Sequence, residues 1–196
     1  YKNRVDYYLL QNIDAARKIL LYEQKVDSKI ANALIGKVIF VRYLIDRKVK
    51  LCFEGISKYW TNEEFCILLN DPKKTKDFFD YLENSETGFN GDLFPLRDEE
   101  YIQIQPIHYS TIRRLLKGED LDEMQPSLFE FYDFSIIPIE FISNVYELFI
   151  GKDNQEKEGA YYTPLFLVDY ILKETIENKL NTQDGYECKV LDPACG

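Results

Sequence analysis

The sequence predicts a mainly α-helical fold, in which a helical domain is followed by the first helix and strand of an α/β domain. Two observations lead to this fold class. Over residues 1–150, apolar side chains recur at steps of three or four, which is the spacing of one helical face. After a polar stretch at 152–159 the pattern becomes a helix, a short β-prone run and a turn of small residues, as at the start of a doubly wound α/β domain.

The composition is that of a folded protein of one large or two small domains. The chain has 196 residues, of which 45% are hydrophobic, so a packed core is expected. No apolar run is long enough to cross a bilayer, and the start, at Tyr1, has neither an initiator Met nor the layout of a signal peptide. We therefore expect a piece of a longer cytoplasmic protein that does not contact membranes.

Cysteine and histidine usage gives no sign of a metal site. The four cysteines form no CxxC pair and have no histidine at ligand spacing, which is typical of intracellular thiols. His108 is the one histidine in the sequence, and we expect it to be structural.

The charge is unevenly distributed along the chain. The net charge is −10, which argues against a free-standing nucleic-acid-binding domain. Residues 1–60, however, hold 12 Lys and Arg against 6 Asp and Glu, a net charge of +6, and the remainder carries −16. A polyanion could approach the first third more easily than the rest, and Arg47, Lys48 and Lys50 are the candidates for contacts with its phosphates, with a solvated basic face as the alternative.

The first two helices are predicted from their apolar spacing. One runs from Asn3 to about Glu23, and the next, which Ser28 is expected to cap, runs to about Arg47. The second is apolar around most of its circumference, which favours a central place in a helical bundle.

Capping signals mark two further helices. "TNEE" at 61–64 has the form of a capping box and predicts a short helix to about Leu69. Asp71-Pro72 places an N-cap before a proline at the first helical position and predicts a helix to about Asn84.

A loop and two more helices complete the predicted helical domain. The loop covers 86–100, and we expect Phe89, Leu93 and Phe94 to pack it against the helices. A helix from Tyr109 to Lys117 ends at Gly118, and another begins near Pro138 and ends before Gly151. Residues 1–150 are expected to hold almost none of the strand content.

Three parts are expected along the chain: a helical linking domain at 1–151, a linker at 152–159 and the start of an α/β domain at 160–196. In the last part, Thr163 and Pro164 begin a helix, and "CKVLD" at 188–192 is suited to a buried strand. The turn "DPACG" then occupies the carboxyl end of that strand, where ligands bind in such sheets. Small residues there allow a ligand to approach the backbone closely.

Two segments together resemble the opening of amino-methylating DNA adenine methyltransferases. They are "GAYYTPLFLVDYI" at 159–171 and "VLDPACG" at 190–196. In that family the first segment lies beside S-adenosylmethionine, and the second begins the loop around the cofactor's methionine end. The resemblance implies cofactor-binding roles for eight residues: Tyr162, Thr163, Pro164, Asp192, Pro193, Ala194, Cys195 and Gly196. Tyr161 lies where the family often has an aromatic residue.

Earlier segments resemble the helical region that precedes the catalytic core of large restriction–modification enzymes. These are the segments at 31–49, 89–95 and 133–150. The resemblance implies a site-specific enzyme that acts on double-stranded DNA and transfers the methyl group of S-adenosylmethionine to the adenine amino group. A nuclease domain and a target-recognition domain often belong to the same chain in that family.

The chain departs from the family pattern because it lacks the catalytic motif. No Asn/Asp-Pro-Pro-aromatic sequence is present, so no catalytic residue is assigned, and the 196 residues alone are expected to be inactive and to bind the cofactor weakly or not at all. The alternatives are a helical interaction module, or the scaffold of a modification subunit without its own catalysis. The residues after Gly196 in the parent gene would discriminate between these hypotheses. A dinucleotide-binding dehydrogenase is disfavoured because GxGxxG is absent.

Overall fold

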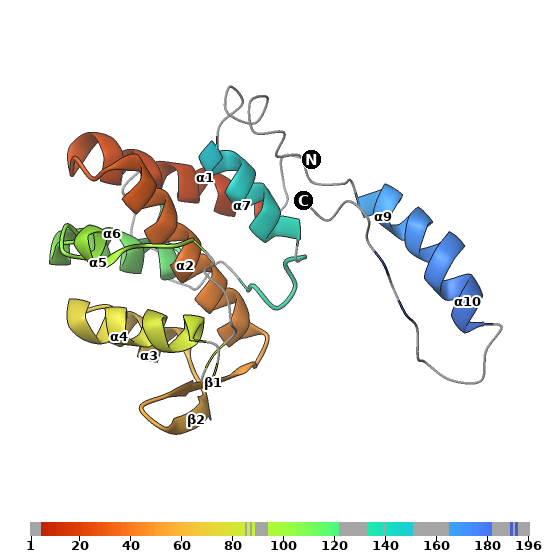
Figure 1. Ribbon diagram of the computed structural model, residues 1–196. Coiled ribbons are helices and arrows are strands. Elements are labelled where there is room, and N and C mark those ends of the chain that lie inside the picture. The colour runs from red at the N-terminus through yellow and green to blue at the C-terminus, as the bar shows by residue number, and fades with distance from the viewer. Residues whose placement is uncertain are drawn as a thin grey trace. The chain divides into compact units, whose positions relative to one another are not determined.

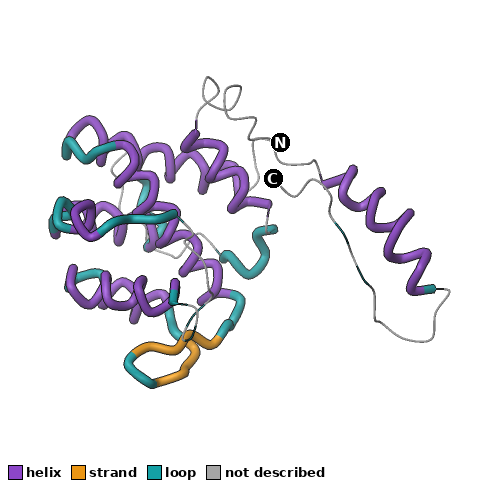
Figure 2. The backbone as a smooth tube through the Cα atoms, in the orientation of Figure 1, coloured by secondary structure: helices purple, strands orange, loops and turns teal. Residues whose placement is uncertain are grey.

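The computed structural model describes residues 5–84, 86, 88, 94–121, 133–138, 140–150, 165–181, 189 and 191 (Figures 1 and 2). The chain divides into two compact units, Tyr1–Gly151 and Lys152–Gly196. The described residues are mainly helical, and their one sheet is a two-stranded antiparallel hairpin. The predicted mainly α fold is therefore confirmed.

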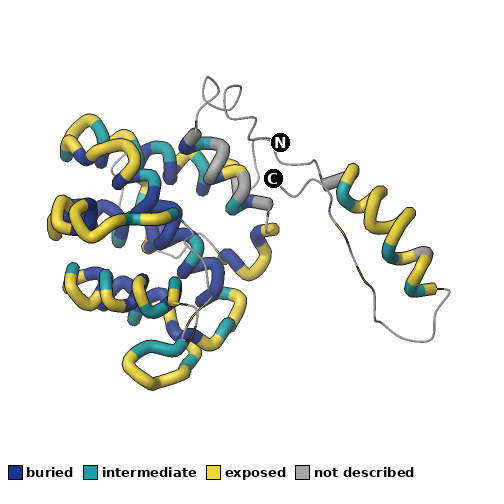
Figure 3. The backbone as a smooth tube through the Cα atoms, viewed as in Figure 1, coloured by how far each residue is buried: buried dark blue, intermediate teal, exposed yellow. Residues whose placement is uncertain are grey.

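Helix α2 (Ser28–Asp46) is the central helix of the first unit. It follows α1 (Val5–Lys18) and one π-helical turn (Ile19–Glu23), and it packs against α1, α6 and α7 (Figure 1). Residues on almost every side of α2 are buried, as its apolar circumference predicts (Figure 3). The predicted cap was wrong: the Asp27 carboxylate accepts the Lys29 backbone N–H, and Ser28 is the first helical residue.

The capping signals of the next two helices are confirmed. In α3 (Asn62–Leu68), the Thr61 hydroxyl accepts from the Glu64 backbone N–H at 3.1 Å, and the Glu64 carboxylate accepts from the Thr61 N–H at 2.9 Å. In α4 (Pro72–Glu83), the Asp71 side chain accepts from the backbone N–H groups of Lys73 and Lys74.

A β-hairpin between α2 and α3 is the main departure from the predicted helical domain. Strands β1 (Lys50–Phe53) and β2 (Ile56–Tyr59) pair antiparallel, with Lys50 opposite Tyr59 and Phe53 opposite Ile56. Glu54 and Gly55 both have positive φ, which gives a two-residue turn the twist that the strands need. The expectation that strands lie outside residues 1–150 is therefore wrong.

Three further helices of the first unit are described: α5 (Asp98–Tyr101), α6 (Pro106–Leu116) and α7 (Glu140–Ile150). Helix α6 begins three residues before the predicted start because Pro106 occupies its first position and His108 accepts the Gln105 backbone N–H through Nδ1 at 3.0 Å. Burial lowers the pKa of His108, so this acceptor nitrogen stays unprotonated at neutral pH.

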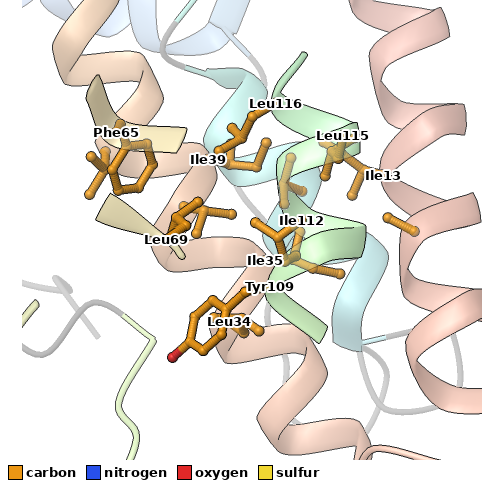
Figure 4. Close-up of a cluster of buried hydrophobic side chains, with 14 of the residues drawn as sticks. Ile13, Leu34, Ile35, Ile39, Phe65, Leu69, Tyr109, Ile112, Leu115 and Leu116 are labelled. Atoms are coloured by element: carbon orange, nitrogen blue, oxygen red, sulfur yellow. The ribbon is translucent and has the colours of Figure 1, made fainter. Parts of the chain in front are cut away.

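The core lies where α2 meets α1, α3 and α6 (Figure 4). The burial of one Leu or Ile side chain in such a core stabilises a fold by roughly 1.5–3 kcal/mol. Ten of its side chains are Ile13, Leu34, Ile35, Ile39, Phe65, Leu69, Tyr109, Ile112, Leu115 and Leu116. Phe94 packs on the edge of this core, as expected, whereas Phe89 and Leu93 lie outside the described residues.

The second unit contains the helix that the sequence predicts after residue 164. It is continuous through α9 (Leu165–Leu172), a π-helical turn (Lys173–Glu177) and α10 (Asn178–Leu180). The predicted linker at 152–159 and the predicted cap, Thr163-Pro164, lie outside the described residues. Within the predicted strand 188–192, Lys189 and Leu191 are described, and neither lies in a strand.

Candidate functional site

The eight residues that the family resemblance places around S-adenosylmethionine lie outside the described part of the chain. They form two segments, one before α9 and one after Leu191. The structure therefore describes the helix that connects these segments, without the segments themselves. The affected residues are Tyr162, Thr163, Pro164, Asp192, Pro193, Ala194, Cys195 and Gly196.

The connecting helix exposes apolar side chains. Tyr170 is 61% exposed, and Leu167, Ile171 and Leu172 are also exposed. Its Thr175 hydroxyl donates to the Ile171 backbone carbonyl at 2.6 Å, so this side chain satisfies its hydrogen bond within the helix. Apolar residues exposed in this way are typical of a helix face that packs against a sheet or another helix.

The second candidate site is the basic segment after α2, which the structure describes in full. Of the three basic residues singled out from the sequence, Arg47 is held by the fold. Its guanidinium donates to the Ile137 carbonyl at 2.8 Å and lies 4.5 Å from the centre of the Tyr43 ring. Arg47 therefore ties the end of α2 to the 133–138 segment, and its charge is only partly available to a ligand.

Lys48 is exposed and lies in the left-handed region, with φ of +57°. This conformation turns the chain from α2 into β1, and the Lys48 backbone N–H donates to the Ile45 carbonyl. The positive charge of Lys48 affects the pKa of Asp133. Hydrogen bonds from Ser135 lower the pKa of Asp133 most, and the charges of Arg42 and Lys48 lower it further.

Lys50 lies on the outer face of the hairpin. Its ammonium is 5.3 Å from the centre of the ring of Tyr59, its partner in the strand register. Tyr59 is itself 57% exposed, so both side chains stand at the surface. Because directly opposed residues share one face of a hairpin, Lys50 and Tyr59 form one small surface.

The inner face of the hairpin is packed tightly, which fixes the position of Lys50. Leu51 is buried, and the Phe53 ring packs edge-on against Phe78 and Tyr81 of α4, with centroids 5.2 and 6.1 Å apart. Trp60, just after β2, lies 5.0 Å from Phe78. An aromatic cluster of this kind holds a short hairpin that would be marginal alone.

The ammonium of Lys58 is paired with the Glu64 carboxylate, so Lys58 does not extend the surface formed by Lys50 and Tyr59. It lies 2.5 Å from the Glu64 carboxylate and 4.6 Å from the centre of the Trp60 ring. The hydrogen bond from Lys58 is the largest cause of the lowered pKa of Glu64. By contrast, no ion pair within the described residues joins Lys48 or Lys50 to a carboxylate.

The hairpin and Tyr59 were missed at the sequence level, although a signal was present. "KLCFEGISKYW" places β-prone residues on both sides of a Glu-Gly pair, which is a pattern typical of a two-residue hairpin. The apolar residues before and after this segment have a strong helical spacing, and the two short strands between them were therefore not predicted.

Neither a membrane-spanning helix nor a metal-binding cluster is found among the described residues. No helix among them has the length and apolar character that crossing a membrane requires. No group of three or more His, Cys, Asp or Glu side chains in the described part of the chain is arranged to hold a metal ion.

Comparison with known proteins gave no match: neither a family model, nor a curated protein, nor a solved structure matches this chain.

Proposed function

We propose that this chain is the helical domain and the beginning of the catalytic core of a DNA adenine-N6 methyltransferase from a restriction–modification system. The observation that carries the proposal is the pairing of two segments, "GAYYTP" at 159–164 and "LDPACG" at 191–196, with one helix between them. Either segment alone has little specificity. Their order and spacing are what the family uses at the start of its Rossmann-like domain.

The proposed cofactor contacts follow from the chemistry of these residues. Ala194 and Gly196 are small enough for S-adenosylmethionine to approach the backbone closely, and Pro193 restricts the turn. The Asp192 carboxylate is suited to a cationic or hydroxyl-bearing group, and Tyr162, Thr163 and Pro164 form a second wall. The cofactor, when bound, supplies an electrophilic methyl group. No residue of this chain is assigned to the acceptance of the adenine amino protons.

Two features of the described residues support this proposal. The segment between the two motifs is helical over Leu165–Leu180, as the β–α alternation of such a domain requires. The helix also exposes Tyr170 and Ile171, which a parallel sheet would cover. The site of action, in this proposal, is duplex DNA in the cytoplasm, with a nuclease and a target-recognition domain as candidate neighbours in the parent chain.

The alternative is a helical interaction module, or the scaffold of a modification subunit without catalysis of its own. The observation that favours it is the buried core of the first unit, to which α1, α2, α3, α4, α6 and α7 contribute and which contains no α/β layer among the described residues. Under this alternative, the two C-terminal segments have no cofactor to bind.

Methyl transfer distinguishes the two functions. The protein with its downstream coding sequence included is incubated with duplex DNA and S-adenosylmethionine labelled in the methyl group, and the nucleosides are analysed by mass spectrometry. We expect labelled N6-methyladenine from the longer protein and none from residues 1–196 alone. Labelled cytosine, or no transfer by the longer protein, would contradict the proposal.

A further inference from the structure

We infer that His108 is an acid-sensitive cap of α6: a proton that adds to its Nδ1 breaks the bond to the Gln105 backbone N–H and opens the first turn of the helix. The inference goes beyond the proposed function and does not depend on it. It concerns a conformational change within the first unit, between a closed and an open first turn of α6.

The hydrogen bond determines where the proton adds. His108 Nδ1 accepts the Gln105 backbone N–H at 3.0 Å, so this nitrogen carries no proton and the neutral imidazole has its proton on Nε2. Protonation therefore takes place at Nδ1 itself. Two N–H groups would then face each other, and the helix would lose the acceptor that satisfies its N-cap residue.

Burial and position in the helix act in the same direction as the lost hydrogen bond. His108 is 5% exposed, and a buried imidazolium loses most of its hydration. It is the third residue of α6, where the helix dipole disfavours a positive charge. In the open turn the imidazole is hydrated and has its ordinary pKa of 6.5, so acid favours the open form.

The elements packed against α6 bring no compensating negative charge to His108 within the described residues. On α6 itself, Arg113 and Arg114 of the last turn are cations, and Arg42 of α2 donates to the Leu116 carbonyl at the same end. Burial alone lowers the pKa of His108. From α1, the end of the π-helical turn and α3, amide side chains make the hydrogen bonds to α6 or to the residues just after it: Asn12, Gln24 and Asn62.

The nearest acid in the sequence, Glu100 of α5, changes charge in a different pH range. Its carboxylate accepts the Arg97 backbone N–H and binds the Lys29 ammonium of α2, which lowers its pKa to about 2. Burial raises the pKa of Tyr109, the neighbour of His108 in the chain, to about 12. Between pH 5 and pH 7, His108 therefore titrates while Glu100 and Tyr109 keep their charge states.

The first turn of α6 also covers part of the core. Tyr109 is buried in the turn, and Ile104 is buried in the segment that leads into it. Opening the turn exposes apolar surface at this end of the core, while the rest of α6 stays packed against α1, α2 and α3. His108 thus couples the uptake of one proton to a local opening.

Two substitutions separate the charge of His108 from its role as an acceptor. His108→Gln keeps an acceptor at the third helical position, where glutamine is a normal partner in a capping box, and it cannot take up a proton. His108→Ala removes the acceptor at every pH. The Thr61 amide is an internal control, because its acceptor is the Glu64 carboxylate, whose pKa is lowered, chiefly by the hydrogen bond from Lys58.

The experiment follows the 196-residue chain by NMR between pH 5 and pH 7. His108 is the one histidine in the sequence, so its Cε1–H signal reports its pKa directly, and we expect a value below 6.5. Hydrogen exchange of the Gln105 amide is measured relative to its intrinsic rate at each pH. Its protection should fall by about tenfold for each pH unit below 6.5, until the pKa of the closed form is reached.

In His108→Gln the protection of the Gln105 amide should no longer depend on pH, and in His108→Ala it should be low throughout. The Thr61 amide should keep its protection in all three proteins. A His108 pKa at or above 6.5, or constant protection of Gln105 in the unchanged chain, would overturn the inference even if neither variant folded. The same pH dependence in His108→Gln as in the unchanged chain would assign the opening to another group.

Discussion

A β-carbon on Gly36 would lie 2.4 Å from Cγ of the Phe94 ring. Gly36 is near the middle of α2, and Phe94, with φ of +58°, lies across it and contacts Phe149 of α7 at a centroid distance of 6.3 Å. A glycine in the interior of a helix normally lowers stability. Here it leaves the space in which the ring packs, so α2, α7 and the segment before α5 meet at one point.

Gly36→Ala should therefore destabilise the protein even though alanine favours helix. Overpacking costs about 1–3 kcal/mol, against a gain of roughly 0.5–1 kcal/mol from helix propensity. We expect the free energy of unfolding to fall by about 1–2 kcal/mol, measured by urea denaturation with Trp60 fluorescence as the signal. In a Phe94→Ala background the same change should cost little. An equally stable Gly36→Ala single variant would show that the ring is not held against α2.

Buried Arg42 should be among the most sensitive positions in the first unit. Its side chain is 3% exposed, its Nε lies 2.9 and 2.8 Å from the two carboxylate oxygens of Asp46, and its Nη1 lies 3.0 Å from the Leu116 carbonyl. Asp46 in turn accepts the Phe134 backbone N–H. Arg42 therefore links α2, α6 and the 133–138 segment.

Arg42→Met should lower the free energy of unfolding by about 3–5 kcal/mol, because it leaves the Asp46 carboxylate without its partner in a mostly buried site. Adding Asp46→Asn should recover part of that loss, since no charge is then left unpaired. Both values come from urea unfolding curves. A loss below about 1 kcal/mol in the Arg42→Met variant would mean that water reaches Asp46 and replaces the guanidinium.

Glu100 should make stability depend on pH in the acid range. Its carboxylate accepts the Arg97 backbone N–H at 2.7 Å and also binds the Lys29 ammonium and the Arg97 guanidinium, in that order of influence, which lowers its pKa from 4.5 to about 2. Because the folded pKa lies below the unfolded one, the stabilisation is complete above pH 4.5 and is lost as the pH falls towards 2.

In Glu100→Gln, the fall in unfolding free energy between pH 5 and pH 2 should be smaller than in the unchanged protein. Glu99→Gln, which removes the exposed neighbouring carboxylate, is the matched control. Thermal unfolding followed by circular dichroism at a series of pH values gives both curves. Parallel curves for Glu100→Gln and the unchanged protein would contradict the role assigned to this carboxylate.

Local signals in the sequence predict the helices well, and contacts between distant residues account for what they miss. Thr61, Asp71 and the apolar circumference of α2 act within one helix, and each prediction based on them is confirmed. The contact of Phe94 with Gly36 joins residues 58 positions apart and leaves no periodic trace. The hairpin at 50–59 likewise depends on α4, whose Phe78 and Tyr81 cover Phe53.

In the candidate sites, too, the local sequence predicts some features and not others. Lys48 and Lys50 are exposed, as their sequence context predicts, but Arg47 is engaged by the Ile137 carbonyl, which no local pattern reveals. The cofactor residues from Tyr162 to Gly196 rest on the family resemblance, and their roles stay predictions.

The proposed cofactor site is tested most directly by titrating S-adenosylmethionine into the protein with its downstream coding sequence included, using isothermal calorimetry. We expect micromolar binding that falls at least tenfold in Asp192→Asn and is unchanged in Asp184→Asn, which removes an acid from the polar segment earlier in the sequence. Residues 1–196 alone should bind weakly or not at all, because in the proposal they supply only the first part of the site. Absence of binding by the longer protein, or equal affinity in the two variants, would contradict the account.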